Sequence, residues 1–314
     1  MNELAAIRVE DPDVFRDTHH LIIRLLAAGK AHGLRIDHPD GLKDPTRYFR
    51  RLQEEYVTAR VLHQLRLPES GEAADAVRQI VSRTNLGTPL FVVAEKILSE
   101  AEPLPTEWAV AGTTGYDFLN AANSLFVASR HRERFDQIYH DFIGRQVDYH
   151  ELLHSCKNLI MRVSMASEIN SLSHQLDRIS ERNRRYRDFT LNALRHTIRE
   201  VIASLSVYRT YIVPGEPLSA RDRRFVEQAV ADANRRNPQA SDALFDFVRE
   251  TILLENLDTF REPDRPAVLE WAARFQQLTG PIMAKGVEDT AFYVFNRFVA
   301  LNEVGGHPDV FGFA

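Results

Sequence analysis

Two acidic residues, each directly following an apolar segment of strand length, are the side chains of this sequence best suited to chemistry. Asp37 follows Gly33-Leu34-Arg35-Ile36, and Glu95 follows Phe91-Val92-Val93-Ala94. Alternation along an extended chain places Arg35 and Asp37 on the same face, so the guanidinium group favours the ionised carboxylate. A carboxylate held in this way can act as a nucleophile.

The second carboxylate supplies a possible partner for the first. If both strands belong to one parallel sheet, Asp37 and Glu95 lie at its carboxyl edge, where (β/α)8 barrels place their chemistry. Glycoside hydrolysis or transfer with retention needs such a pair, one group attacking the anomeric carbon and the other protonating the leaving oxygen. The neighbouring Arg35 makes Asp37 the better candidate for the nucleophile, and the apolar strand before Glu95 makes it the better candidate for the proton donor. The positive charge of Lys96 opposes the protonated form of Glu95. Spacing alone leaves open that both carboxylates only form structural salt bridges.

Helical and strand-like patterns alternate in the first part of the chain. Continuous apolarity at 89–94 indicates a strand buried on both faces, as in a parallel sheet. The order of helix, strand, helix and strand is typical of an α/β protein. Apolar spacing predicts helices over 12–30, from Pro45 to about 65 and over 74–84, and strands at 33–37 and 89–94.

From about residue 118 to residue 278 the pattern changes to successive helices without a convincing strand. Ser219 with Asp222 resembles a capping box at the start of one of them. Residues 280–286 are expected to return to loop or strand character. The helical spacing recurs around 121–127, 134–143, 149–167, 189–207, 224–234, 242–254 and 267–278.

Composition excludes several classes of protein. The 39 basic and 44 acidic residues give a net charge of −5, which offers no general reason to expect nucleic-acid binding. The single cysteine allows no intrachain disulfide and fits a reducing, cytoplasmic location. No apolar run approaches the length of about 18 residues that a membrane-spanning helix needs, so no membrane association is expected. No metal site is expected, because His19 and His20 lie on the exposed side of a helix.

Seven segments together resemble the maltooligosyltrehalose synthases of the α-amylase superfamily. Residues 33–37 match the pattern Gly-x-Arg-x-Asp of the superfamily's second conserved region, and residues 91–95 resemble its third. The narrower resemblance covers essentially the whole chain. It is carried by residues 33–42, 93–98, 112–118, 187–192, 207–212, 283–293 and 301–306.

The resemblance implies roles for individual residues. Asp37 corresponds to the catalytic nucleophile, Glu95 to the general acid/base and Arg35 to the arginine that contacts the nucleophile. His38, Asp40 and Lys96 fall where such enzymes line their sugar sites. A further group is implied to shape the acceptor end of the site, although a turn that caps the next helix explains it equally well: Thr113, Thr114, Tyr116 and Asp117.

The resemblance also implies an α/β fold that is mostly helical. Residues 1–118 would form the middle strands of a (β/α)8 barrel, residues 119–278 a helical insertion, and residues 279–314 a return toward the barrel. The implied substrate is a maltooligosaccharide or a linear α-1,4-glucan. Its reducing-end α-1,4 bond is converted to an α,α-1,1 bond without a cofactor. A trehalose-releasing hydrolase is the implied functional partner.

The sequence departs from the superfamily at two conserved regions. Neither the pattern Asp-x-x-x-Asn-His nor a suitable His-Asp pair after the helical block occurs in it. Asp289 is a candidate for the third site carboxylate, which otherwise lies beyond Ala314. We therefore expect an internal fragment that has no mutase activity alone. Two alternatives remain, an amylase-like α-glucan hydrolase and a non-catalytic helical interaction domain.

Overall fold

The computed structural model describes residues 7–99 and 102–312, and the chain divides into two compact units. Unit 1 comprises residues 1–96 and 103–115, and unit 2 comprises residues 97–102 and 116–314. Helices predominate, and the described strands form one three-stranded parallel sheet in unit 1, so the expected mostly helical α/β character is confirmed. None of the described helices is long and apolar enough to cross a membrane.

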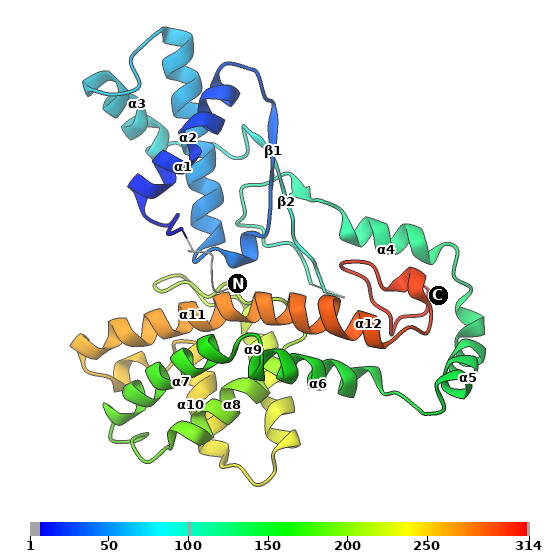
Figure 1. Cartoon of the computed structure of the whole chain (residues 1–314). Coiled ribbons are helices and arrows are strands. Elements are labelled where there is room, and N and C mark those ends of the chain that lie inside the picture. Colours follow the sequence, from blue (N-terminus) through cyan, green and yellow to red (C-terminus); the bar gives the residue numbers. More distant parts are fainter. Residues whose placement is uncertain (1–6, 100–101, 313–314) are drawn as a thin grey trace. The chain divides into compact units, whose positions relative to one another are not determined.

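Unit 1 packs three helices with the small sheet. Figure 1 shows β1 and β2 side by side, and the strand order is β1-β2-β3. The expected helices and both expected strands are present. Their bounds are α1 (Pro12–Ala27), β1 (Gly33–Ile36), the 3-10 turn η1 (Pro39–Gly41), α2 (Pro45–Leu65), α3 (Glu72–Arg83), β2 (Phe91–Ala94) and β3 (Gly112–Thr113).

Burial of β2 differs from the expectation of a strand covered on both faces. Val92 and Ala94 are fully buried, whereas Phe91 at the start of the strand is 59% exposed. A continuous apolar run therefore marks a strand here without showing that both faces are covered.

A buried glutamine of α2 fixes where β2 begins. The Gln53 side chain, 2% exposed, donates to the carbonyl oxygens of Leu90 (3.0 Å) and Ala109 (2.8 Å), and accepts from the Leu90 N–H (2.8 Å). Buried amides need such partners, so the three bonds leave little freedom for the strand to slip. The position of Gln53 thus determines which residues stand at the end of β2.

Unit 2 is a helical assembly whose elements run from α4 to η6. One of the two bonds of the expected capping box is present, since the Ser219 hydroxyl accepts from the Asp222 N–H at 3.0 Å, whereas the Asp222 carboxylate accepts from the Tyr211 N–H at 3.3 Å. One helix outside the expected ranges is α7, whose buried stripe comprises Ile169, Leu172, Leu176 and Ile179. The helices are α4 (Tyr116–Ser124), α5 (Arg132–Ile143), α6 (Tyr149–Arg162), α7 (Ala166–Glu181), α8 (Leu191–Ser204), α9 (Ala220–Arg236), α10 (Asp242–Ile252), α11 (Arg265–Met283) and α12 (Phe292–Val294). Short 3-10 turns are η2 (Ser129–His131), η3 (Leu257–Thr259), η4 (Glu262–Asp264) and η6 (Val299–Leu301).

The expectation of a loop or strand at 280–286 is wrong. Helix α11 runs through Gly280 and Pro281 and continues as a π-helical segment, η5 (Ala284–Ala291), into α12, which Figure 1 shows as one row. Gly280 and Ile282 are buried in this stretch. Tertiary packing outweighs the weak helix propensity of glycine and proline here.

The π-helical segment lies very close to α6 at one glycine. A Cβ atom added to Gly286 would lie 2.9 Å from Cγ and 3.0 Å from Cα of Lys157. The second contact is with backbone, which cannot rotate away. Glycine is therefore required where η5 packs on α6.

We expect Gly286→Ala to destabilise the protein by about 1–2 kcal/mol. Overpacking costs about 1–3 kcal/mol, and the helix propensity gained offsets up to about 1 kcal/mol. Urea unfolding followed by far-ultraviolet circular dichroism measures the change. The control Lys285→Ala should stay within about 0.5 kcal/mol of the parent, since the ammonium makes a long ion pair (3.8 Å) with Asp289. An unchanged midpoint for Gly286→Ala would contradict the packing argument.

Candidate active site

The ends of the parallel strands bring three of the predicted site residues to one edge. The register pairs Ile36 with Ala94, so Asp37 and Glu95 occupy corresponding positions one residue further along. The Glu95 N–H donates to the Ile36 carbonyl oxygen at 2.8 Å, which continues the ladder to this point. Thr114 takes the equivalent position beside Glu95, and its N–H donates to the Ala94 carbonyl oxygen at 2.9 Å.

The predicted pairing of Arg35 with Asp37 is present. Nη1 of Arg35 lies 2.7 Å from Oδ1 of Asp37, and both side chains are exposed, at 53% and 73%. An exposed ion pair adds little to folding stability. Its consequence is local, because the guanidinium group restrains a carboxylate that solutes can reach.

A backbone amide connects the two carboxylate-bearing segments. The His38 N–H donates to Oε2 of Glu95 at 3.0 Å. Beyond His38 the chain enters η1, where Asp40 is buried and pairs with the buried Lys96 at 3.3 Å. Of the residues expected to line a sugar site here, His38 is exposed, whereas Asp40 and Lys96 are not.

Of the remaining predicted site residues, Thr113 lies in β3 of unit 1, and Tyr116, Asp117 and Asp289 belong to unit 2. The side chain of Tyr116 lies against Gly305, where an added Cβ would come within 2.8 Å of the tyrosine Cβ. Asp117 is exposed in the first turn of α4. The side chain of Asp289 is 68% exposed and lies 3.8 Å from the ammonium group of Lys285.

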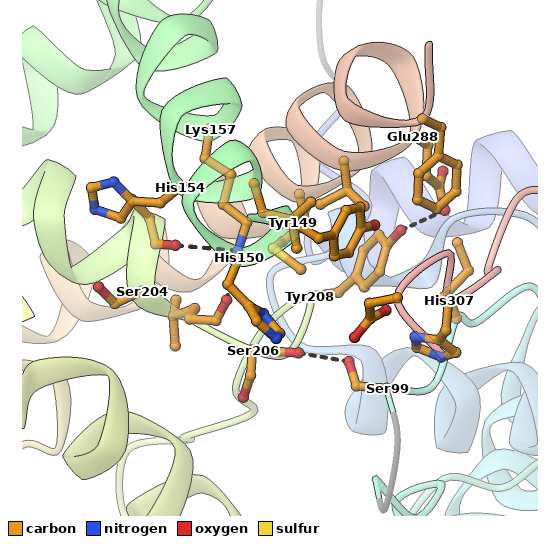
Figure 2. Close-up of a pocket in the computed structure, with 18 of the residues that line it drawn as sticks. Ser99, Tyr149, His150, His154, Lys157, Ser204, Ser206, Tyr208, Glu288 and His307 are labelled. Atoms are coloured by element: carbon orange, nitrogen blue, oxygen red, sulfur yellow. Dashed lines mark hydrogen bonds between the residues drawn. The ribbon is translucent and has the colours of Figure 1, made fainter. Parts of the chain in front are cut away.

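Unit 2 contains a cavity of about 520 Å³ (Figure 2). Its walls bring together segments that are distant in the chain, namely the 97–99 stretch, α6, the stretch after α8, η5 and the 305–309 loop. Aromatic, acidic, basic and hydroxyl side chains share the lining. A volume of this size, with a few converging polar groups, is typical of a small-molecule site.

Glu288 is a carboxylate of the cavity that sequence reasoning missed. Its Oε1 accepts from the Tyr208 hydroxyl at 2.6 Å and from the Gly305 N–H at 3.1 Å (Figure 2). The neighbouring Asp289, which the sequence suggested, does not line the cavity. A π-helix bonds each residue to the one five positions away. Ordinary helical periodicity therefore could not show which of the two acids faces inward.

Lys157 of α6 also lines this cavity, and its side chain is buried from solvent. Its ammonium group donates to the carbonyl oxygens of Leu205 (2.7 Å) and Ala203 (3.3 Å), close to where α8 ends (Figure 2). Burial lowers the pKa of Lys157 to about 8. A cation at a helix C-terminus is favourable, so the residue ties α6 to the end of α8.

Metal binding finds no support in the side-chain placement. Among residues 7–99 and 102–312, no three or more His, Cys, Asp or Glu side chains converge closely enough to hold an ion.

Solved structures and curated proteins identify what this chain resembles. No protein-family model matches it. The maltooligosyltrehalose synthase of Arthrobacter ramosus superposes on the whole chain with a TM-score of 0.75 and 34% identity. The chain is a homologue of the maltooligosyltrehalose synthases. A hypothetical synthase of Sulfolobus tokodaii likewise covers all of it, with a TM-score of 0.66 and 25% identity. A putative synthase of Mycobacterium tuberculosis is 26% identical over 312 residues.

The homology spans only part of each maltooligosyltrehalose synthase. The chain covers 33% of the Arthrobacter and Mycobacterium proteins and 32% of the Sulfolobus protein. Four of the segments that carry the sequence resemblance to these synthases line the cavity of unit 2, through Ile97, Tyr208, Glu288 and Gly305. Four of the seven segments therefore converge in space.

A buried glutamate, Glu200, holds together the helices beside this cavity. Oε2 of Glu200 lies 3.2 Å from Nε2 of His154 and accepts from the Asn237 side chain at 3.1 Å, and Oε1 accepts from Asn158 at 3.3 Å. Burial disfavours the charged form of Glu200, but the bonds from His154 and Asn237 outweigh it. They lower its pKa from 4.5 to about 2.

We expect Glu200 to stabilise the folded chain above about pH 4.5 and to lose this contribution as the pH falls toward 2, because the folded pKa is below the unfolded one. Glu200→Gln should lower the unfolding free energy at about pH 5 by on the order of 2 kcal/mol more than at about pH 3. Urea titrations at both pH values measure this. Glu227→Gln, at an exposed ion pair with Arg223 (3.3 Å), is the control. Equal losses at the two pH values would contradict the assignment.

Proposed function

We propose that this chain carries the nucleophile and the general acid/base of a retaining transglycosylase that acts on α-1,4-linked maltooligosaccharides. The observation that carries the proposal is the common sheet edge, where Asp37 and Glu95 stand at corresponding positions and the His38 amide contacts Glu95. The homology to maltooligosyltrehalose synthases supports the substrate and the direction of the reaction.

The proposed reaction has two displacements. Asp37 attacks the anomeric carbon at the reducing-end α-1,4 bond, while Glu95 gives its proton to the leaving glucose oxygen. A covalent glycosyl-enzyme and a free glucose result. Glu95, now ionised, then takes the proton from the anomeric hydroxyl of that glucose, which attacks the glycosyl carbon and releases Asp37. Two inversions retain the α configuration, and the product is the α,α-1,1-linked, non-reducing isomer.

Arg35 contacts the proposed nucleophile directly. Its guanidinium group lies 2.7 Å from the Asp37 carboxylate. The contact restrains the carboxylate that we assign as the nucleophile. Thr114, exposed beside Glu95 at the same edge, is a proposed contact for the sugar hydroxyls.

The cavity of unit 2 is the proposed binding site for one sugar unit. The Glu288 carboxylate can accept hydrogen bonds from sugar hydroxyl groups there. Tyr149 and Tyr208 offer aromatic rings and hydroxyl groups for contact with the sugar. A mutase must retain the freed glucose and exclude water, otherwise the intermediate is hydrolysed. Tyr116, Asp117 and Asp289 remain proposed substrate contacts.

A (β/α)8 barrel is the proposed parent architecture of unit 1. The parallel order β1-β2-β3 with intervening helices fits part of such a barrel, and a closed barrel leaves no sheet edge. On this proposal residues 1–118 belong to the barrel, 119–278 to a helical insertion and 279–314 to the return toward it. A trehalose-releasing hydrolase, which would consume the product, is the proposed functional partner.

A mechanism-based α-glucosyl epoxide tests the proposed roles without requiring full turnover. We expect covalent labelling of the purified chain at Asp37, located by peptide mass mapping and abolished in Asp37→Asn. Glu95→Gln should slow labelling by about 10²-fold or more, since acid assistance opens the epoxide. Asp75→Asn, at an exposed ion pair with Arg78 (3.0 Å), should label at the parental rate.

Labelling that persists in Asp37→Asn would overturn the assignment of the nucleophile. Incubation with maltopentaose separates the two carbohydrate activities. A non-reducing isomer indicates the mutase, and released glucose indicates the hydrolase. The sequence predicts that residues 1–314 alone do not form the non-reducing isomer, because two conserved regions of the superfamily are not among them.

A further inference from the structure

The turn that follows Asp37 contains a charged pair that is closed to solvent. Asp40 and Lys96 are 4% and 1% exposed, and Nζ of Lys96 lies 3.3 Å from Oδ2 of Asp40. A side chain buried to this extent is poorly placed to contact a sugar. Separating the partners of a buried ion pair costs free energy. The pair therefore holds together the two chain segments that carry it.

These two segments are the ones that carry the proposed catalytic carboxylates. Lys96 directly follows Glu95, and Asp40 lies three residues after Asp37 in η1. The ion pair thus connects the residue next to the acid/base with the turn next to the nucleophile. The residue between nucleophile and turn is His38.

His38 adopts a backbone conformation that its sequence context disfavours. Its φ and ψ angles of 44° and 53° are left-handed, which costs a non-glycine residue about 1–2 kcal/mol. The following Pro39 favours an extended conformation for His38. The surrounding structure must therefore hold the turn. The ring of His38 lies against Gly41, where an added Cβ would be 2.8 Å from its Cδ2.

The left-handed conformation has a direct effect on Glu95. It directs the His38 N–H to Oε2 of Glu95, at 3.0 Å. An oxygen that accepts from a fixed backbone N–H is the less suitable one to carry a proton. The carboxyl group is then oriented, with Oε1 as the oxygen for proton transfer.

We propose that Asp40 and Lys96 are positioning residues that hold His38 left-handed, so that its amide fixes Oε2 of Glu95 and leaves Oε1 to exchange the proton with the sugar. The proposal rests on the proposed function for its chemistry. In the first displacement Oε1–H donates to the leaving oxygen. In the second, Oε1 takes the proton from the attacking hydroxyl.

Hydrogen exchange of two backbone amides in the full chain tests the proposal. The His38 amide reports the contact with Glu95, and the Glu95 amide reports the strand ladder through its bond to Ile36. In Lys96→Met the His38 amide should exchange about tenfold faster, the loss of one hydrogen bond of ordinary strength. The Glu95 amide should keep its protection. Lys96→Arg, which keeps the charge, should restore slow exchange at His38.

The double variant Asp40→Asn/Lys96→Met replaces the pair by neutral side chains. It is used for the same exchange measurement if the single variant does not fold. Asp75→Asn is the control and should change neither amide. Equal protection of His38 in parent and variants overturns the proposal. Joint loss of protection at both amides also overturns it, because the pair would then only support the sheet.

The amide measurement needs no substrate, so it is independent of the proposed function. Labelling of Asp37 without a response of the His38 amide overturns the positioning role and leaves the proposed function standing. A response of the amide without labelling supports the positioning of Glu95 and overturns the assignment of Asp37 as nucleophile.

Discussion

The parallel pairing of β1 with β2 is the constraint on which the candidate site depends. Because side chains alternate along a strand, a shift of one residue would turn Glu95 to the opposite face of the sheet. Two hydrogen bonds between Leu90 and the buried Gln53 fix the start of β2, and the ladder bond from Glu95 to Ile36 fixes its end. Placement of the two carboxylates thus depends on a neutral amide of α2.

The two ion pairs at this edge differ in their exposure to solvent. The Arg35–Asp37 pair is exposed, where solvent weakens it and a solute can reach the carboxylate. The Asp40–Lys96 pair is buried, where separation of the partners is costly and the geometry is stiff. A site built in this way combines a reachable reactive group with a rigid support, and both lie within a few residues of the same strand ends.

The parts of the site that were predictable follow from local patterns. Strand-length apolar runs ending in Asp37 and Glu95 located the common edge, and the two-residue spacing of Arg35 located its ion pair. Burial of Asp40 and Lys96 was not predictable, since charged residues are seldom buried and only tertiary contacts show where they are. Two further predictions were missed for a related reason: the helix that runs through Gly280 and Pro281, and the choice of Glu288 over Asp289 as the residue that faces the cavity. Packing imposed a π-helix that neither propensity nor the usual periodicity reveals.

The Glu288 carboxylate has a consequence for how unit 2 holds together. One oxygen joins the stretch after α8, the π-helical segment and the 305–309 loop, which are far apart in the chain. The cavity exists only when all three are in place, so the unfolded chain offers no equivalent site. Any small molecule that occupies the cavity is therefore linked by mass action to the folding of unit 2, and it raises the stability of that unit as its concentration rises above the dissociation constant.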